Sequence, residues 1–266
     1  MSILSYAHEH GCEWNWETCC RAARNGNIEC LRYAHEHGCE WNRTVCNKAA
    51  KYGHLDCLRY AVEYGCSWDI STCRMAVSTG NIECLRYLHE KGCYWAESIC
   101  SAAAANGQLE CLIYLHENGC SWDKSTCWEA SQNGHLDCLR YAHEQGCGWD
   151  VLACGAAARN GRLPILIYLH ENGCVWDKSS FAGAAKRGHL NCLKYLREQG
   201  CGADPTACEL AAENGHLDCL IYLHGEGCPW DYNTYLKAAI NRHLDCVRYL
   251  YDKGCGENIC YTKPTI

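Results

Sequence analysis

Histidine and cysteine are the residues in this chain best suited to chemistry, and they recur together in the order His-x3-Cys-x6-Cys-x10-Cys. Three thiolates and one imidazole form a common tetrahedral shell for structural zinc. A bound zinc ion also helps a small module to fold. The pattern therefore raises the hypothesis of a structural metal-binding repeat protein with one Cys3His zinc site per repeat. Four sets are complete: His8, Cys12, Cys19 and Cys30; His35, Cys39, Cys46 and Cys57; His89, Cys93, Cys100 and Cys111; and His116, Cys120, Cys127 and Cys138.

These sets belong to a repeat of 27 residues that runs along the chain. One cysteine column, meaning a series of positions 27 residues apart, extends from Cys12 to Cys255 without an exception. Glycine, tyrosine, tryptophan and alanine form further columns with the same period. A fixed period between about 20 and 50 residues is the signature of a repeat array. We therefore expect one structural unit per 27 residues.

The same cysteines also fit a role in core packing, because a buried thiol behaves as a small apolar side chain. Where cysteine is lost from its columns, Ile165, Phe181 and Tyr235 stand in its place. Val62 replaces a histidine, yet the three cysteines of its repeat remain. A zinc site that had lost one ligand would leave the other three ligands free to change. We therefore favour packing over zinc and expect no cofactor.

Thiols could also form disulfides or act as nucleophiles. Bridges within one column would exceed the limit of ~7 Å between Cα atoms, whereas bridges between columns stay open. No secretory signal is visible at the N-terminus, so we expect reduced thiols in an intracellular compartment. A pair such as His143 and Cys147 recurs in seven repeats, whereas a reactive thiol needs one special environment. We therefore predict that the chain is not an enzyme.

Each repeat is predicted to form two short helices. In residues 122–146, Asp123 is a good N-cap, and apolar side chains then recur at helical spacing. Gly134 is expected to end the first helix and Gly146 the second. On the second helices, pairs such as Arg32 and Glu36 are expected to neutralise each other at i, i+4. Two such helices bury too little surface alone, so stability must come from contacts between repeats.

Composition excludes two classes of partner. The 266 residues contain 31 acidic residues against 24 Lys and Arg, a formal net charge of −7. This charge argues against coating a nucleic acid, which requires excess positive charge. No apolar run approaches the roughly 18 residues of a membrane span. A soluble protein that binds neither nucleic acid nor membrane is predicted.

The repeat resembles the ankyrin repeat, whose core reads A-A-x-x-G-H-x-[DE]-x-[LV]-x-x-L-x-x-x-G. The resemblance covers the chain from about residue 3 to 256. An ankyrin unit has about 33 residues, and the missing residues lie where ankyrins carry a projecting β-hairpin finger. Short units rich in Cys and Trp look like the ankyrin-type arrays of large DNA viruses of amoebae and of some protists. One copy of the core consists of Ala211, Ala212, Gly215, His216, Asp218, Leu220, Leu223 and Gly227.

The resemblance implies both a fold and a function. The implied fold is all-α, an α-solenoid of about ten helix-turn-helix repeats of 27 residues without fingers. We expect a single array over residues 1–260, with a partial first repeat at 1–12, repeats to about 256, and a tail at 261–266. The implied function is a non-catalytic protein–protein interaction scaffold that binds a protein partner through the concave face of its first helices.

Positions that vary between repeats are the predicted source of specificity on this face. Exposed Trp and Arg dominate interface energetics, so Trp16, Arg74 and Trp128 are the preferred anchors. The alternative is that these positions are only unconstrained surface. The predicted contact residues are Trp16, Arg43, Arg74, Lys124, Trp128 and Lys178.

The N-terminal end has no clear capping repeat. The chain opens inside a second helix at Ile3, Leu4 and Tyr6. Terminal repeats need a polar outer face for solubility. We therefore expect Leu4 and Tyr6 to be exposed or to cover another chain, which would provide a route to self-association.

Overall fold

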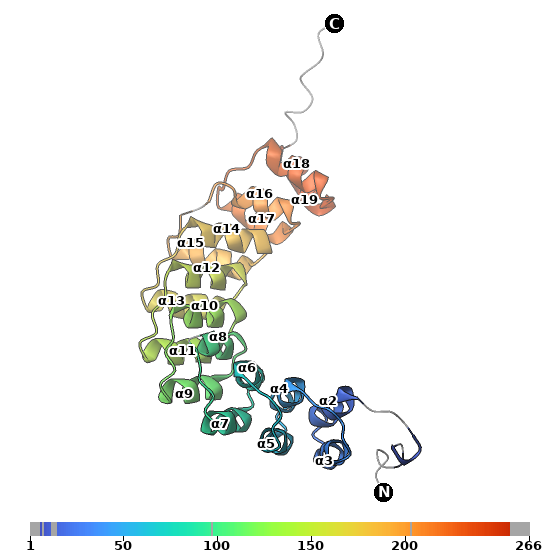
Figure 1. The fold of residues 1–266 in the computed structure, drawn as a ribbon. Helices are drawn as coiled ribbons and strands as arrows, with labels where there is room; N and C mark the ends of the chain where they lie inside the picture. Colours follow the sequence, from blue (N-terminus) through green and yellow to red (C-terminus); the bar gives the residue numbers. More distant parts are fainter. Residues whose placement is uncertain (1–5, 7, 12–14, 97, 203, 256–266) are drawn as a thin grey trace. The chain divides into compact units, whose positions relative to one another are not determined.

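The computed structural model describes residues 6, 8–11, 15–96, 98–202 and 204–255. Every regular element in these ranges is a helix, and they contain no strand (Figure 1). The predicted all-α solenoid of helix pairs without β-hairpin fingers is confirmed. Of the partial first repeat expected at 1–12, only Tyr6 and residues 8–11 are described, and the tail at 261–266 lies outside the described residues.

Each repeat contributes a first helix and a second helix of seven to ten residues. The first helices are α2 (Trp16–Arg24), α4 (Arg43–Tyr52), α6 (Ile70–Ser78), α8 (Ser98–Ala105), α10 (Lys124–Asn133), α12 (Val151–Arg159), α14 (Lys178–Arg187), α16 (Ala207–Glu213) and α18 (Tyr232–Ile240). The second helices are α3 (Ile28–Glu36), α5 (Leu55–Glu63), α7 (Ile82–Glu90), α9 (Leu109–Glu117), α11 (Leu136–Glu144), α13 (Leu163–Glu171), α15 (Leu190–Glu198), α17 (Leu217–Gly225) and α19 (Leu244–Asp252).

The chain divides into two compact units. One lies within Met1–Glu129 and Asp137–Cys147, and the other within Ala130–Leu136 and Gly148–Ile266. In the first unit α2, α4, α6 and α8 pack side by side in sequence order, and each also packs against its own second helix (Figure 1). In the second unit α12, α14, α16 and α18 do the same. No described helix is long and apolar enough to cross a membrane.

The Trp-Asp or Trp-Asn pair that replaces the ankyrin finger begins the next first helix. Asn42 and Asp150 adopt an extended backbone, and their side chains accept hydrogen bonds from the amides of Thr44 and Leu152. Asp123 accepts from the amide of Ser125 at 2.9 Å, as its predicted N-cap role requires. A side chain of this kind satisfies an amide that has no partner within the helix.

Glycine ends the first helices for two reasons. Gly188 follows α14 with φ 77°, in the left-handed region that other residues rarely adopt. A Cβ atom at Gly188 would also lie 2.5 Å from Nδ1 of His216 in the next repeat. The glycine therefore allows both the turn and the close approach of the following repeat. Arg242 occupies the equivalent position after α18 with φ 62°.

The invariant cysteine column makes a hydrogen bond between repeats. The thiol of Cys39 donates to the carbonyl of Asn15 at 3.1 Å, and that of Cys66 donates to Asn42 at 3.2 Å. Both acceptors are N-cap residues of the preceding first helix. An apolar side chain has no donor for this carbonyl. The interpretation of these cysteines as apolar filling is therefore corrected for this column, although Cys39 and Cys66 are buried as expected.

The other two cysteine columns behave as core positions. Cys57, Cys84 and Cys111 on the second helices are fully buried. Where cysteine is replaced, Ile165 and Phe181 are equally buried. The predicted packing role is therefore confirmed at these buried positions, where apolar residues of different size fill equivalent sites, whereas Cys30 and Tyr235 are only half-buried.

This difference between columns is testable with Cys66→Val. The substitution removes the donor to Asn42, and a typical intramolecular hydrogen bond contributes about 1 kcal/mol. Cys57→Val is the matched control, because Cys57 is as buried as Cys66 but donates no hydrogen bond in the described structure. Cys66→Val should therefore lower the free energy of unfolding in urea by about 1 kcal/mol more than Cys57→Val. Equal losses would show that the thiol acts only by filling space.

Candidate binding face

The first helices carry all six predicted contact residues. Four of them stand at the first position of a helix, and the other two lie one turn further along. Five are exposed, whereas Trp128 is half-buried. Lys178 belongs to the second compact unit and the others to the first. The residues are Trp16 in α2, Arg43 in α4, Arg74 in α6, Lys124 and Trp128 in α10, and Lys178 in α14.

Arg43 and Trp16 differ in how they are engaged. The Arg43 guanidinium lies 2.9 Å from Oδ2 of Asp69, the N-cap of α6 in the next repeat. Hydrogen bonds from Ser71 and then Arg43 lower the pKa of the Asp69 carboxyl. Arg43 therefore braces two neighbouring repeats. The Trp16 ring is 44% exposed and offers an apolar surface at the start of α2.

The structure gives the described ligands of a proposed zinc set different partners. In the second set, Cys46 is hydrogen-bonded to Cys66 of the next repeat, while Cys39 pairs with Cys19 of the preceding one. His35 lies 3.0 Å from the hydroxyl of Tyr60. Across the described ranges, no group of three or more His, Cys, Asp or Glu side chains could hold a metal ion. The histidine and cysteine side chains that are regularly spaced in the sequence therefore do not converge on one point in space.

The cysteines proposed as zinc ligands lie in or at the edge of the core. Cys12 lies outside the described residues, and Cys30 is half-buried. The buried ones are Cys19, Cys39, Cys46, Cys57, Cys93, Cys100, Cys111, Cys120, Cys127 and Cys138.

Burial keeps many of these sulfurs as thiols. It raises the pKa of Cys57 to about 11 and that of Cys111 to about 12. A hydrogen bond with Cys66, followed by burial, raises the pKa of Cys46 further. Zinc ligands and nucleophiles are thiolates. The environment of these cysteines therefore opposes the ionisation that either role would need.

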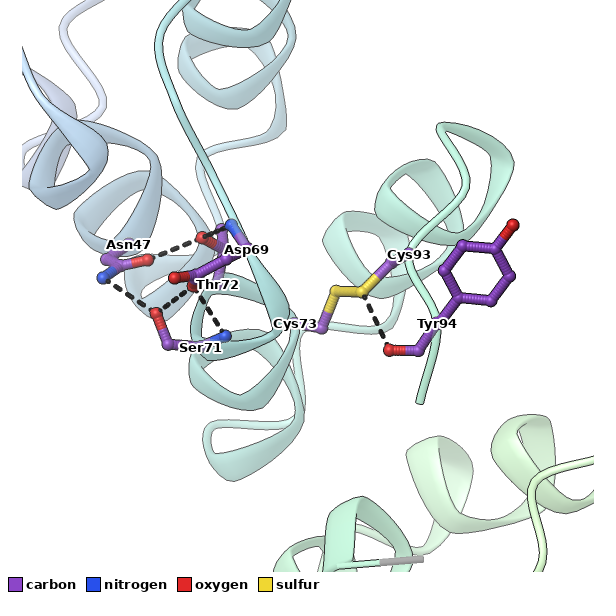
Figure 2. The surroundings of a disulfide bond; sticks show 7 residues. All are labelled: Asn47, Asp69, Ser71, Thr72, Cys73, Cys93 and Tyr94. Atoms are coloured by element: carbon purple, nitrogen blue, oxygen red, sulfur yellow. Dashed lines mark hydrogen bonds between the residues drawn. A yellow bond between two sulfur atoms is a disulfide. The ribbon is translucent and has the colours of Figure 1, made fainter. Parts of the chain in front are cut away.

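Cysteines on the first helices lie close to cysteines of the invariant column that come 20 residues later in the sequence. Cys100 and Cys120 lie 3.1 Å apart at sulfur, and Cys73 is joined to Cys93 by a disulfide. Figure 2 shows this bond between α6 and the loop after α7, with Tyr94 beside it. The expectation of reduced thiols is wrong for this pair, and the bridge is of the kind between columns that the spacing left open. It joins α6 to the loop after α7.

Figure 2 also shows a polar network on the same helix. Thr72 donates to Asn47 Oδ1 at 2.6 Å, and Asn47 donates to the Ser71 hydroxyl at 3.4 Å. Ser71 in turn donates to the N-cap Asp69. Asn47 belongs to α4, so the network joins two repeats and satisfies the buried Thr72 hydroxyl.

Histidine, tryptophan and tyrosine form a repeated cluster. The His116 ring stacks on Trp122 with centroids 3.9 Å apart, and its Nδ1 lies 3.0 Å from the Tyr141 hydroxyl. His89 and His224 make the same contacts in their repeats, and His8 lies 3.4 Å from the Tyr33 hydroxyl. The hydroxyl donates when Nδ1 carries no proton. The Tyr column was predicted to be core with a satisfied hydroxyl. In the repeats that carry the histidine, that histidine is the partner of the hydroxyl, whereas the ring is buried at Tyr60 and only half-buried at Tyr114, Tyr141 and Tyr249.

Tyr87 shows what happens when that histidine is missing. Val62 stands at the histidine position of its repeat, and the buried Tyr87 hydroxyl has no hydrogen-bond partner among the described residues. A buried unsatisfied hydroxyl costs free energy of folding. The substitution at Val62 was visible in the sequence, but its consequence required the distance between histidine and tyrosine of successive repeats.

Two further interactions between repeats were missed. The guanidinium groups of Arg32 and Arg59 lie over the rings of Tyr60 and Tyr87, 5.4 Å from each centroid. They do not form the expected i, i+4 ion pairs, because the ring of the next repeat lies under them. In addition, His54 Nε2 lies 3.0 Å from the carbonyl of Arg24, at the end of the preceding first helix. The Gly-His spacing of the repeat was the available signal.

Comparison with known proteins agrees with this architecture. A family model described as ankyrin repeats (3 copies) matches residues 19–98 and 181–262, more than half of the chain. The chain belongs to the ankyrin repeat family. No match was found among curated proteins. Ankyrin repeats generally mediate protein–protein interaction.

A solved structure supports the same fold. The human ASB11 ankyrin repeat domain is 19% identical to this ankyrin repeat chain, with a TM-score of 0.53. The match covers 59% of this chain and 84% of the ASB11 domain. At this identity the likeness concerns the fold alone.

The orphan hydroxyl predicts a stabilising substitution. Val62→His should place a ring nitrogen beside the Tyr87 hydroxyl and raise the free energy of unfolding by about 1 kcal/mol. His116→Val is the reciprocal change, and it should lower stability by about 1–3 kcal/mol because it strands the Tyr141 hydroxyl. Urea unfolding measures both. If Tyr87→Phe were destabilising, the hydroxyl would have a partner and the prediction would be wrong.

Two half-buried histidines predict a loss of stability in acid. Partial burial lowers the pKa of His189 and of His224 below the ordinary value of about 6.5. The unfolded chain then binds protons that the folded chain does not, so their contribution is complete above about pH 6.5 and is lost as pH falls. His189→Asn removes one titrating group, and the equivalent Asn81 already donates to helix-end carbonyls at 2.9 Å. The variant should lose less stability than the wild type between about pH 7.5 and 5.5. An equal loss of the free energy of unfolding in the variant and the wild type between these two pH values would contradict this prediction.

Proposed function

We propose that this ankyrin repeat chain is a non-catalytic scaffold that binds a protein partner through the face of its first helices. The observation that carries the proposal is that the recurring side chains make contacts within the array, whereas the exposed side chains of the first helices vary between repeats. The recurring thiols, imidazoles and phenols contact one another or backbone carbonyls within the array. The residues exposed on the first helices differ from repeat to repeat.

This separation between structural and variable side chains favours a role in protein binding over catalysis or structural metal binding. Catalysis requires a polar group that is accessible and poised, but the recurring histidines are stacked and hydrogen-bonded in the same way in several repeats. The contact residues supply instead what an interface uses, namely the exposed Trp16 ring and charged side chains such as Arg74 and Lys124.

We also propose a reducing intracellular setting and an origin among the short Cys- and Trp-rich arrays of large viruses or protists. The many unbridged cysteines among the described residues support the reducing setting, to which the Cys73–Cys93 bridge is an exception, and the 27-residue unit supports the origin.

The proposed face is tested by affinity capture from the native cell extract with a triple variant, Trp16→Ala, Arg74→Ala and Trp128→Ala. We expect proteins captured by the wild type to be lost while the chain stays folded, because Trp16 and Arg74 are exposed and Trp128 is only half-buried. The control carries Glu29→Ala, Glu110→Ala and Glu117→Ala on exposed parts of the second helices and should capture normally.

Three results of this experiment would count against the proposal. If the control loses the same proteins, the first-helix face is not the binding surface. If the triple variant fails to fold, the three residues belong to the core. Zinc at a stoichiometry near four or more ions per chain, in protein purified without added metal, would favour the Cys3His alternative.

A further inference from the structure

A positively charged hollow lies on the first helices of the second compact unit. It has a volume of about 420 Å³ and is bounded by residues of α12, α14 and α16. Its sides carry the exposed cations of Arg159, Lys186 and Arg187. Its base is formed by half-buried Ala182, Gly183 and Leu210. The site thus combines three cations with a small apolar floor.

Gly183 creates the space for this hollow. A Cβ atom at Gly183 would lie 3.4 Å from both Cβ and Nε of Arg159, so the arginine side chain runs directly past the glycine. Several other repeats carry long side chains at this position, such as Lys48 and Glu129, while Ala102 and Ala156 carry only a methyl group. Gly183 is the one glycine in this column, and it leaves room for the Arg159 side chain.

The three cations are not needed to complete the helices that carry them. Cations near a helix C-terminus often serve its free carbonyls. Here His189 already hydrogen-bonds the Arg159 carbonyl, and His216 Nε2 lies 3.1 Å from the Lys186 carbonyl. Among the described residues, neither Arg159, Lys186 nor Arg187 forms an ion pair.

Equivalent cations elsewhere are engaged within the fold. Arg24 and Lys51 occupy the Arg159 column in the first unit, and both lie over the ring of Tyr52, at 5.3 and 6.0 Å from its centroid. The carboxylates of Glu209 and Glu213, which follow the hollow, are held by Lys237. The positive charges of Arg159, Lys186 and Arg187 are therefore available to bind an anion from outside the chain.

The neighbouring histidine supports a positive potential here. The pKa of His189 is lowered first by burial, and the charges of His216, Arg162 and Arg187 lower it further. Several cations thus act on one region of the surface, and a negative group placed there would be attracted.

We propose that this hollow receives the carboxylate side chains of an acidic segment of a protein partner. The inference rests on the proposed function and adds the chemistry of the partner. The alanine, glycine and leucine floor suits the aliphatic part of a Glu side chain, while the cations suit its carboxylate. A nucleic acid fits less well, because coating a polyanion requires an extended excess of positive charge, whereas the whole chain has a net charge of −7 and these cations form one local cluster.

The test is fluorescence anisotropy with a labelled twelve-residue peptide of alternating Glu and Ala and with its Gln counterpart. The full chain should bind the Glu peptide at low salt, and at least tenfold more weakly when Arg159→Gln, Lys186→Gln and Arg187→Gln are combined. Gly183→Glu should weaken binding similarly, because it fills the hollow and supplies an internal carboxylate. The Gln peptide should not bind.

The matched control combines Arg21→Gln, Arg24→Gln and Lys51→Gln, which changes the net charge equally on the first helices of the other unit. It should bind the Glu peptide like the wild type. Equal weakening in the control, undiminished binding by the hollow variants, no binding of the Glu peptide by the wild type, or tighter binding of a single-stranded oligonucleotide would each overturn the inference. Loss of captured proteins from the Trp16, Arg74 and Trp128 variant would still support the proposed function in any of these cases, so the two failures are distinguishable.

Discussion

Polar contacts join neighbouring repeats throughout the described part of this chain. A short helix leaves amides without acceptors at its N-terminus and carbonyls without donors at its C-terminus. The His54 ring of the following repeat reaches the carbonyl of Arg24 at the end of α2, and the Cys66 thiol adds a second hydrogen bond to the N-cap carbonyl of Asn42. Short helices joined by short loops are therefore stable only as neighbours, which accounts for the strict 27-residue period.

The same dependence explains why a sequence rich in cysteine and histidine forms no metal site in the described residues. Zinc binding requires ligands from one repeat to converge, but the imidazole turns to the tyrosine of the next repeat and the thiols pair across repeats. The invariant cysteine column and the recurring histidines make contacts that join one repeat to the next. Polar side chains that recur in every repeat are expected to hold the repeats together, whereas the residues of an active site are expected at one place in the chain.

Features particular to single repeats occur where the sequence departs from the repeat pattern. Val62 leaves the Tyr87 hydroxyl unpaired, Gly183 opens a hollow beside Arg159, and Arg242 takes a backbone conformation that glycine has elsewhere. Structural columns tolerate these departures because the surrounding repeats hold the fold. Exposed first-helix residues such as Trp16 and Arg74 stand at positions that vary between repeats, and we propose them for recognition of a partner.

The period, the N-cap and glycine positions and the apolar columns were enough to predict the helix pairs, their limits and the burial of Cys57 and Phe181, because comparison of repeats within one chain separates constrained from free positions. The partners across repeats were decided only by tertiary structure. Cys100 meets Cys120, His116 meets Tyr141, and Arg32 covers Tyr60. These pairs depend on how far and at what angle one repeat is displaced from the next, and periodicity carries no information about that displacement. For the same reason a zinc set with regular spacing could be written from the sequence, although its ligands point to different neighbours.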